Sequence, residues 1–325
     1  MPAILEVDNL VKKYGDFEAV KGISFTVEEG EVFGLLGPNG AGKTQTISML
    51  TSVIEPTSGT ARIGGFDIRT QRDQAKKING LVPQDLALYP TLSARANLNF
   101  FGRIYGLRGK DLKQRVDDVL RIVALTERAD QAVEKYSGGM KRRVNIGAGL
   151  LHHPRLFFLD EPTVGVDPQS RNQIFESVQQ LNRERGMSII YTSHYMEEVE
   201  FLCNRVAIVD SGRIIAIDTI KNLVAMLGGG VIQLGLNQVD EALLKDLSAL
   251  SGVKQASLAV QSPKAEGEQA PKGQVVKIEC VNSQQALVSV VSYLGSHNLT
   301  ITALETLEPN LESVFLHLTG KSLRD

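Results

Sequence analysis

The sequence has 325 residues, of which 42% are hydrophobic and 22% charged, and its formal net charge is -2 at pH 7. This composition is ordinary for a globular protein with room for about two domains, and the near-neutral charge excludes a chain drawn as a whole to nucleic acid or anionic lipid. The two cysteines, Cys203 and Cys280, have no metal-ligating partners at a useful spacing. We expect both to be buried apolar residues in a reducing compartment.

The N-terminus, residues 1–8, lacks the charged stretch and following apolar stretch of a signal peptide. No run approaches the roughly 18 apolar residues that a helix needs to cross a bilayer. We therefore expect a cytosolic chain, in which any role at a membrane comes through a partner.

Short runs at residues 4–7 and 23–27 have the residue types of strands, and they are separated by turns at 15–16 and 29–30. Residues 59–63, followed by two glycines, continue this pattern. We expect a small antiparallel sheet here.

The most informative stretch lies between a buried strand at 31–36 and a helix that opens at 46–51, and it reads Gly37-Pro38-Asn39-Gly40-Ala41-Gly42-Lys43-Thr44. Two glycines separated by four residues and followed by Lys and a hydroxyl residue form the phosphate-binding loop pattern. A strand that enters a helix through such a turn directs backbone N–H groups at one point, and glycines let phosphate oxygens approach the backbone. An accidental glycine-rich turn is the alternative, and the strand–loop–helix setting argues against it. The loop predicts binding of a nucleoside triphosphate, with Lys43 between the β- and γ-phosphates and the Thr44 hydroxyl on Mg²⁺.

From residue 91 to about 151 the pattern becomes helical. Apolar residues at helical spacing predict one core-facing stripe in an inserted helical lobe, and they are Leu112, Val116, Val119, Leu120 and Val123.

Tyr136-Ser137-Gly138-Gly139-Met140 comes before a predicted helix that starts at Lys141. A Ser and two glycines at a helix N-terminus can bind a second phosphate. An ordinary helix cap explains Ser137 equally well. We interpret Lys141, Arg142 and Arg143 as a solvated helix turn.

The apolar strand at 156–159 ends in Asp160 and Glu161. Asp160 can hold Mg²⁺ directly or through water, and Glu161 can polarise an attacking water. The alternative is a solvated acidic turn. A helix at 169–185 and a strand at 188–191 complete a predicted parallel βαβ unit.

The pattern changes after Gly228-Gly229-Gly230, a predicted hinge. We expect strand 231–236, helix 239–250, strand 253–260, a polar exposed loop at 262–273, strand 274–281, helix 284–296, strand 299–307 and a last helix from residue 310. The order β-α-β-β-α-β is that of a ferredoxin-like unit.

The order of four motifs resembles that in the ATPase subunits of ATP-binding cassette (ABC) transporters. The motifs are the phosphate loop, Ser137-Gly138-Gly139, Leu159-Asp160-Glu161-Pro162 and Thr192-Ser193-His194. The resemblance covers about residues 3–222 and implies an α/β P-loop NTPase cassette with a parallel sheet core, an antiparallel β lobe and a helical lobe. We accordingly divide the chain into a nucleotide-binding domain at 1–225, with its helical lobe at about 91–151, and an α+β ferredoxin-like accessory domain at 231–325.

The resemblance also implies the roles of individual residues. Tyr14 stacks on adenine, Gln84 touches Mg²⁺ and transmits to the membrane subunit, and His194 contacts the γ-phosphate. Glu161, His194 and Lys43 are the implied catalytic residues, and Thr44, Gln84 and Asp160 are the implied metal site. The implied ATP-binding residues are Tyr14, Gly37, Pro38, Asn39, Gly40, Ala41, Gly42, Lys43, Thr44 and Gln45.

Two cassettes sandwich two ATP molecules in this family. The resemblance implies that Ser137, Gly138 and Gly139 cap the γ-phosphate of the nucleotide on the opposite cassette, and that Asp167 lies in the loop that crosses to it. Gln45 stands where the family usually has a second hydroxyl residue, while Met140 and Tyr136 replace the usual Gln and Leu of the signature. The departure at Gln45 puts the side-chain contact of this residue to the α-phosphate in doubt, whereas the departures at Met140 and Tyr136 keep the phosphate-facing Ser137 and Gly139.

Residues 88–93 with Asn97-Leu98, and residues 307–320, resemble type-2 ABC exporters of drugs, polysaccharides or lipids. This implies an ATP-hydrolysing subunit that pairs with itself or a paralogue under a separate integral membrane permease, at the cytoplasmic face of the membrane and without nucleic acid. The alternatives are a soluble ABC ATPase acting on ribosomes or nucleic acid, and a nucleotide-binding regulator in which Glu161 and His194 are idle. The cargo is chosen by the permease and is not encoded here.

Overall fold

The computed structural model of the chain describes residues 2–237, 239–258, 274–297, 299–307 and 309–320. Two compact units are present: the first ends at Ile220 and the second begins at Lys221. No helix in the described ranges is both long and apolar enough to cross a bilayer.

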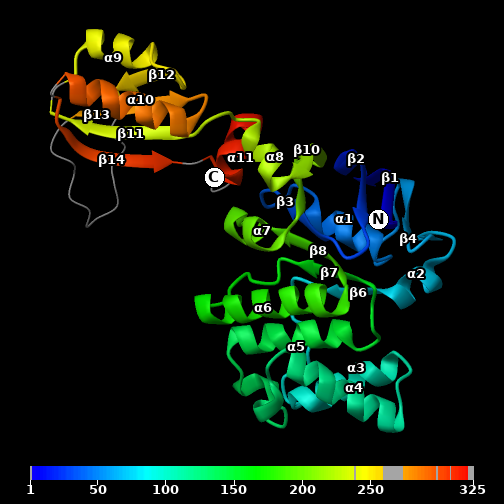
Figure 1. Cartoon of the computed structure of the whole chain (residues 1–325). Helices are drawn as coiled ribbons and strands as arrows, with labels where there is room; N and C mark the ends of the chain where they lie inside the picture. The colour runs from blue at the N-terminus through cyan, green and yellow to red at the C-terminus, as the bar shows by residue number, and fades with distance from the viewer. Residues whose placement is uncertain (1, 238, 259–273, 298, 308, 321–325) are drawn as a thin grey trace. The chain divides into compact units, whose positions relative to one another are not determined.

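The first unit is built around a six-stranded sheet with the order β10-β9-β3-β8-β7-β6, in which β10 alone runs antiparallel to its neighbour (Figure 1). Its strands are β3 (Val32–Leu36), β6 (Asn79–Val82), β7 (Leu156–Asp160), β8 (Ser188–Ser193), β9 (Arg205–Asp210) and β10 (Arg213–Thr219). Every residue of β3, β7 and β8 is buried, as expected for parallel strands covered on both faces. The carboxyl ends of the parallel strands meet at one edge, so the residues that follow them are brought together there.

The predicted antiparallel sheet is present, with the order β2-β1-β4-β5. Its strands are β1 (Ala3–Tyr14), β2 (Phe17–Glu28), β4 (Ser58–Ile63) and β5 (Phe66–Asp67). The first two strands are much longer than the predicted runs because the polar residues between these runs lie on the exposed face. On the buried face, Phe25 stacks on Phe33 of β3 with ring centroids 5.3 Å apart, so the two sheets share one core.

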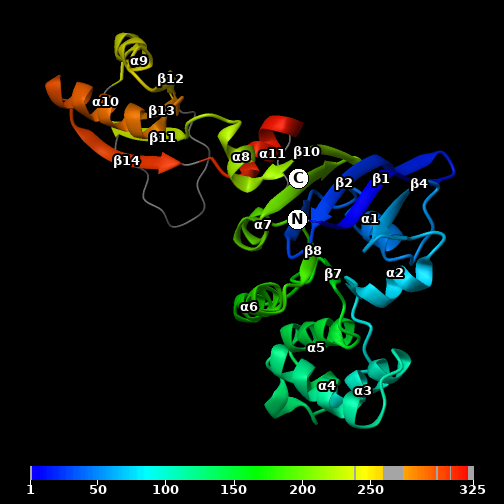
Figure 2. The ribbon, with the colours of Figure 1, turned by 45° about the vertical axis from the view of Figure 1, so that its right-hand side comes forward.

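The helices of the first unit are α1 (Lys43–Leu50), α2 (Arg72–Ile78), α3 (Ala94–Ile104), α4 (Gly109–Ile122), α5 (Gly138–Leu150), α6 (Pro168–Arg185) and α7 (Met196–Leu202). Figures 1 and 2 show α3, α4 and α5 gathered at the end of this unit away from β1 and β2, as a helical lobe. The apolar stripe predicted along residues 112–123 is buried in this lobe. The strands β7 and β8 are parallel and α6 lies between them in sequence, which confirms the predicted βαβ unit.

The predicted solvated turn at residues 141–143 is wrong for two of its three residues. Arg142 and Arg143 are buried, with 5% and 6% of their surface exposed. Arg142 donates to the Pro83 carbonyl at 3.0 Å, and Arg143 donates to the carbonyls of Val123 and Ala124 at 3.0 and 3.1 Å. The guanidinium groups therefore pair with backbone carbonyls just after the ends of β6 and α4, and residue spacing alone does not reveal such contacts.

The second unit has a four-stranded antiparallel sheet with the order β12-β13-β11-β14. After α8 (Ile220–Ala225) its elements are β11 (Val231–Leu236), α9 (Glu241–Ser248), β12 (Val253–Leu258), β13 (Gln274–Cys280), α10 (Ser283–Ser296), β14 (Ile301–Leu307) and α11 (Leu311–Thr319). This is the predicted ferredoxin-like element order. The predicted loop at 262–273 and the last two residues of the predicted strand 253–260 lie outside the described residues.

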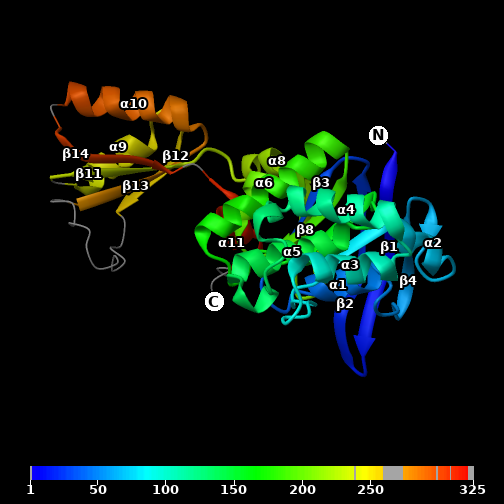
Figure 3. The same cartoon turned by 90° about the horizontal axis from the view of Figure 1, so that it is seen from below.

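Alternate residues of β11, namely Ile232, Leu234 and Leu236, are buried against both α9 and α10. Since alternate side chains of a strand point to one face, both helices cover the same face of this sheet (Figures 2 and 3). The core of the second unit therefore lies between two layers, one formed by the sheet and the other by α9 and α10.

Candidate functional site

The phosphate loop, residues 37–42, connects β3 to α1 as predicted. Gly42 is the N-cap of α1 with φ +101°, and a Cβ atom at this position would lie 2.7 Å from the Ala19 carbonyl oxygen. Both the backbone angle and the close approach require glycine. The N-terminus of α1, with its unpaired N–H groups and positive dipole end, is thereby left open to an anion.

A cavity of about 640 Å³ is lined by this loop and by residues from distant parts of the first unit. The predicted site residues that line it are Tyr14, Asn39, Gly40, Gly42, Lys43, Thr44, Gln45, Gln84, Glu161 and His194. Phe17, Val164 and Tyr195 line it as well and were not predicted. The cavity thus brings together three of the four motifs that the sequence singled out.

Lys43 supplies the positive charge of the cavity. Its buried ammonium group donates to the carbonyls of Gly37 and Pro38 at 2.7 and 3.0 Å. Its Nζ also lies 3.1 Å from Oε1 of Glu161, which is buried too. Charge-assisted bonds of this kind fix the ammonium at the mouth of the loop.

Glu161 is the centre of the polar contacts in the cavity. Its Oε2 accepts from Gln84 Nε2 at 3.4 Å and lies 3.5 Å from His194 Nδ1. Its backbone is left-handed, with φ +44°, although it is not a glycine. This conformation costs about 1–3 kcal/mol and persists where the surroundings hold it. It turns the Glu161 side chain away from the line of β7 and toward Lys43.

Thr192 of β8 holds both acidic residues in place. Its hydroxyl donates to Asp160 Oδ1 at 2.8 Å and accepts from the Glu161 N–H at 2.9 Å. The motif Thr192-Ser193-His194 contains this residue, but its role was not predicted. Its position on a parallel neighbour of β7, level with the acidic strand end, is the signal that could have identified that role.

The oxygen donors expected to hold Mg²⁺ fit that ion. Asp160 is buried, which raises the pKa of its carboxyl group, and hydrogen bonds from the hydroxyls of Thr192 and Thr44 oppose this rise. The Thr44 hydroxyl and the Asp160 carboxylate are therefore in contact. No group of three or more His, Cys, Asp or Glu side chains in the described ranges could hold a metal alone. A hydroxyl, a carboxylate and the Gln84 amide suit a Mg²⁺ ion that shares its remaining positions with phosphate oxygens and water.

Tyr14 lies at the rim of the same cavity. Half of its surface is exposed, and its hydroxyl donates to Oε1 of Gln45 at 2.8 Å. An exposed aromatic ring at the edge of a phosphate site can stack on a base, and the unusual Gln45 is the residue that orients it here.

Ser137, Gly138, Gly139 and Asp167 do not line the cavity. Ser137 is the N-cap of α5 and accepts from the Met140 N–H at 3.2 Å. Asp167 is the N-cap of α6 and accepts from the Ser170 N–H at 2.9 Å, which lowers the pKa of its carboxyl group. A Cβ atom at Gly139 would overlap the Ser170 side chain, so these two helix starts are packed together.

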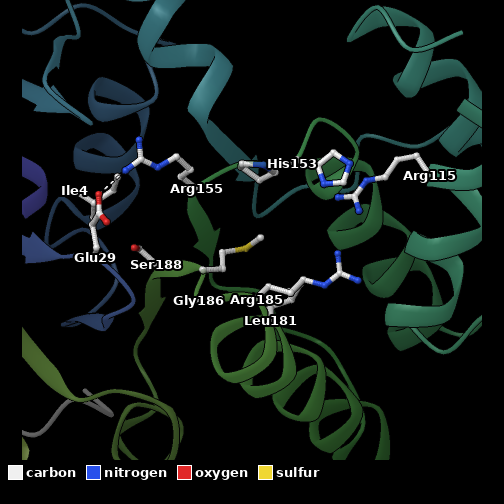
Figure 4. A pocket seen from close by; sticks show the side chains of 11 residues that line it. Ile4, Glu29, Arg115, His153, Arg155, Leu181, Arg185, Gly186 and Ser188 are labelled. Carbon is white, nitrogen blue, oxygen red and sulfur yellow. Dashed lines mark hydrogen bonds and ion pairs between the residues drawn. The ribbon is translucent and has the colours of Figure 1, made fainter. Parts of the chain in front are cut away.

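A second cavity, of about 420 Å³, lies where β7 and β8 begin, at the opposite edge of the sheet. Figure 4 shows its walls: Arg155 points toward Glu29, with which it pairs, and Arg115, His153 and Arg185 gather on the other side. No residue singled out by the sequence motifs lines it. The nucleotide chemistry therefore belongs to the first cavity.

Comparison with known proteins identifies the family of the chain. Residues 20–164 match the ABC transporter family. The linearmycin resistance ATP-binding protein LnrL of Bacillus subtilis (strain 168) is 47% identical over 99% of this chain and 100% of that protein. The Nod factor export ATP-binding protein I of Ralstonia nicotianae is 36% identical over 99% of this chain and 95% of that protein.

Solved structures show the same fold. The protein cbiO1 from Clostridium perfringens, part of the ABC transporter complex cbiONQ, superposes with a TM-score of 0.64 and 29% identity over 69% of this chain and 92% of that chain. A dimeric ATP-binding cassette in a post-hydrolysis state with ADP and phosphate superposes with a TM-score of 0.60 and 25% identity over 66% of this chain and 98% of that chain. These similarities confirm the resemblance and the cassette fold inferred from the motifs. The chain belongs to the ABC transporter family, as an ATP-binding subunit that hydrolyses ATP.

Proposed function

We propose that this chain is the motor of an exporter, in which two copies, or one copy and a close paralogue, close on two ATP molecules and drive a separate integral membrane permease from its cytoplasmic side. One observation supports this most. The phosphate loop, Gln84, Glu161 and His194 share one cavity, whereas Ser137–Gly139 lie outside it. A second phosphate-binding helix start outside the first site suits a composite site made by two chains.

In the proposed reaction, ATP binds with adenine on Tyr14 and its phosphates on the loop. Lys43 exchanges its ion pair with Glu161 for the β- and γ-phosphate oxygens. The freed Glu161 carboxylate then takes a proton from water as the water oxygen attacks the γ-phosphorus and the bond to the β-phosphate oxygen breaks. His194 donates to the γ-phosphate. Mg²⁺, when held by Thr44, Asp160 and Gln84, neutralises charge on the phosphates.

The docking surface proposed for the permease is the 86–105 apolar patch, defined by the exposed side chains of Leu86, Tyr89, Phe100, Ile104 and Tyr105. Tyr89 and Phe100 contact edge to face, with centroids 4.9 Å apart. Exposed apolar groups in such number favour a protein partner. The patch begins two residues after Gln84, so a partner that binds it can respond to the contact between Gln84 and Glu161.

Complementation between two inactive chains tests the composite site. Lys43→Ala removes the phosphate contact and Ser137→Arg blocks the opposite face, so each variant alone should be inactive. Mixed in equal amounts with random pairing, they should recover about a quarter of wild-type turnover, because half of the pairs contain one intact site. A mixture of Lys43→Ala with the double variant Lys43→Ala/Ser137→Arg contains no intact site and is the control. Full ATPase activity in a strictly monomeric wild-type sample would contradict the proposal.

A further inference from the structure

The proposed reaction does not use Glu198, although this residue is a carboxylate buried close to the site. It lies in the first turn of α7, and only 2% of its surface is exposed. Three hydroxyl groups donate to it: Thr163 at 2.7 and 2.8 Å to its two oxygens, Ser193 at 2.8 Å and Tyr191 at 3.0 Å. A buried carboxylate is costly unless it is hydrogen-bonded, and this one is fully engaged.

The three donors come from the two segments that carry the chemistry. Thr163 lies two residues after Glu161, in the loop that leads to Asp167. Tyr191 and Ser193 lie on one face of β8, immediately before His194. A single carboxylate therefore joins the segment of Glu161 to the segment of His194.

The contact reaches the turn of His194 itself. The Ser193 hydroxyl donates to Glu198 and also accepts from the Tyr195 N–H at 2.9 Å. The second bond joins the residues on either side of His194 and so closes the turn that carries it. Between Tyr191 and Ser193, Thr192 points the other way and bonds Asp160 and Glu161. The last three residues of β8 are thus held on both faces.

Arg171 connects this centre to α6. Its Nε lies 3.5 Å from Glu198 Oε1, an ion pair without hydrogen-bond geometry, and its guanidinium lies 5.4 Å from the centroid of the Tyr195 ring. Since α6 starts directly after Asp167, Glu198 contacts the 161–167 loop, α6 and the end of β8.

We propose that Glu198 is a positioning residue for ATP hydrolysis, which sets the His194 turn against the 161–167 loop and passes movement of that loop on to His194. This inference rests on the proposed roles of Glu161 and His194. Glu198 does not touch the nucleotide in this account, so its loss slows turnover without weakening ATP binding.

The first test observes His194 directly and requires no hydrolysis. The chain has five histidines, so the imidazole signals can be recorded by NMR on the full chain, and the signal that disappears in His194→Ala belongs to His194. Glu198→Gln should move that signal, while Glu197→Gln, an exposed neighbour on the same helix turn, should not. An unmoved His194 signal in a folded Glu198→Gln protein would overturn the inference, whatever the ATPase result.

The second test separates positioning from general stability. Thr163→Val keeps the shape of the side chain and removes its hydroxyl, whereas Thr163→Ser keeps the hydroxyl. Thr163→Val and Glu198→Gln should each lower kcat at least about tenfold with little change in KM for ATP, as loss of supporting contacts does at other sites, and Thr163→Ser should restore most of the rate.

In a His194→Ala background, Glu198→Gln should lower kcat much less than in the wild type, because both changes remove the same function. Two results would overturn the inference: fully additive losses, or a normal rate in His194→Ala beside a slow Glu198→Gln. Absence of ATPase activity in the wild type with a normal NMR response would count against the proposed function and leave the placement of His194 by Glu198 supported.

Discussion

The two units of the chain bury different kinds of side chain. The first unit buries several polar and charged groups in and beside its site, including Lys43, Asp160, Glu161 and Glu198. In the described part of the second unit, no polar or charged side chain is buried, and the buried residues are aliphatic apart from Cys280 and Phe315. Buried polar groups need matched partners and are costly to misplace, so they accumulate where chemistry requires fixed geometry.

This difference indicates how the work is divided. The first unit contains strained backbone at Glu161 and hydrogen-bond networks that join distant segments. The second unit has an apolar core between a sheet and two helices, which is enough for a stable two-layer domain. Its described residues include no buried polar or charged side chain. We therefore propose that it acts in assembly, by stabilising the pair of cassettes or docking on the permease.

The largest expected effect comes from Glu161→Gln, which should abolish most of the ATP turnover and leave the structure of the first unit intact. Glu161→Gln keeps the side-chain shape and removes the general base, so turnover should fall by roughly a hundredfold or more. ATP binding should persist, because Lys43 and the loop remain. Steady-state ATPase rates and equilibrium ATP titrations of the same preparation measure both quantities. Near-normal turnover would refute the role assigned to Glu161.

A smaller effect is expected where the first unit holds its acidic pair. Thr192→Val removes the hydroxyl that bonds both Asp160 and the Glu161 N–H. We expect kcat to fall about tenfold, since the catalytic groups remain but lose a support. Thr192→Ser keeps the hydroxyl and is the matched control. Equal rates for the two variants would show that the bridge has no part in catalysis.

The sequence allowed close prediction of the second unit because simple periodicity determines it. Strand residues 231–236 were placed without error, and the helix predicted at 284–296 is α10, which begins one residue earlier. The core of this unit forms where the apolar face of the sheet packs against the apolar sides of its helices, and the spacing of apolar residues along the chain predicts both.

In the first unit, local motifs predicted the phosphate loop and the acidic strand end, and the family resemblance implied the cavity residues Gln84 and His194. They did not predict the burial of Arg142 and Arg143, the positive φ of Glu161 or the hydroxyls around Glu198. Each of these depends on partners far away in sequence, such as Pro83 for Arg142 and Thr192 for Glu161. Such contacts form only when distant segments fold together, so no periodic pattern of residues in the sequence predicts them.

The smallest expected effect on nucleotide binding comes from removing the second unit. A chain that ends at Asn222 retains every residue that lines the nucleotide cavity. We expect its dimer closure or its assembly with the permease to weaken, because we propose these roles for the removed part. Sedimentation with ATP and co-purification with the permease measure these losses.

The central claim, that the first unit holds the entire nucleotide site, is tested most directly by the ATP affinity of this shortened chain. The titration uses the Glu161→Gln background, so that no ATP is consumed, and circular dichroism with a cooperative thermal transition establishes that the protein is folded. We predict a Kd within about twofold of the full-length value, since every residue that lines the cavity lies in the first unit and a domain with its own core can fold alone. A folded short chain whose ATP affinity falls tenfold or more would show that the second unit contributes to the site, and would contradict the division proposed for this protein.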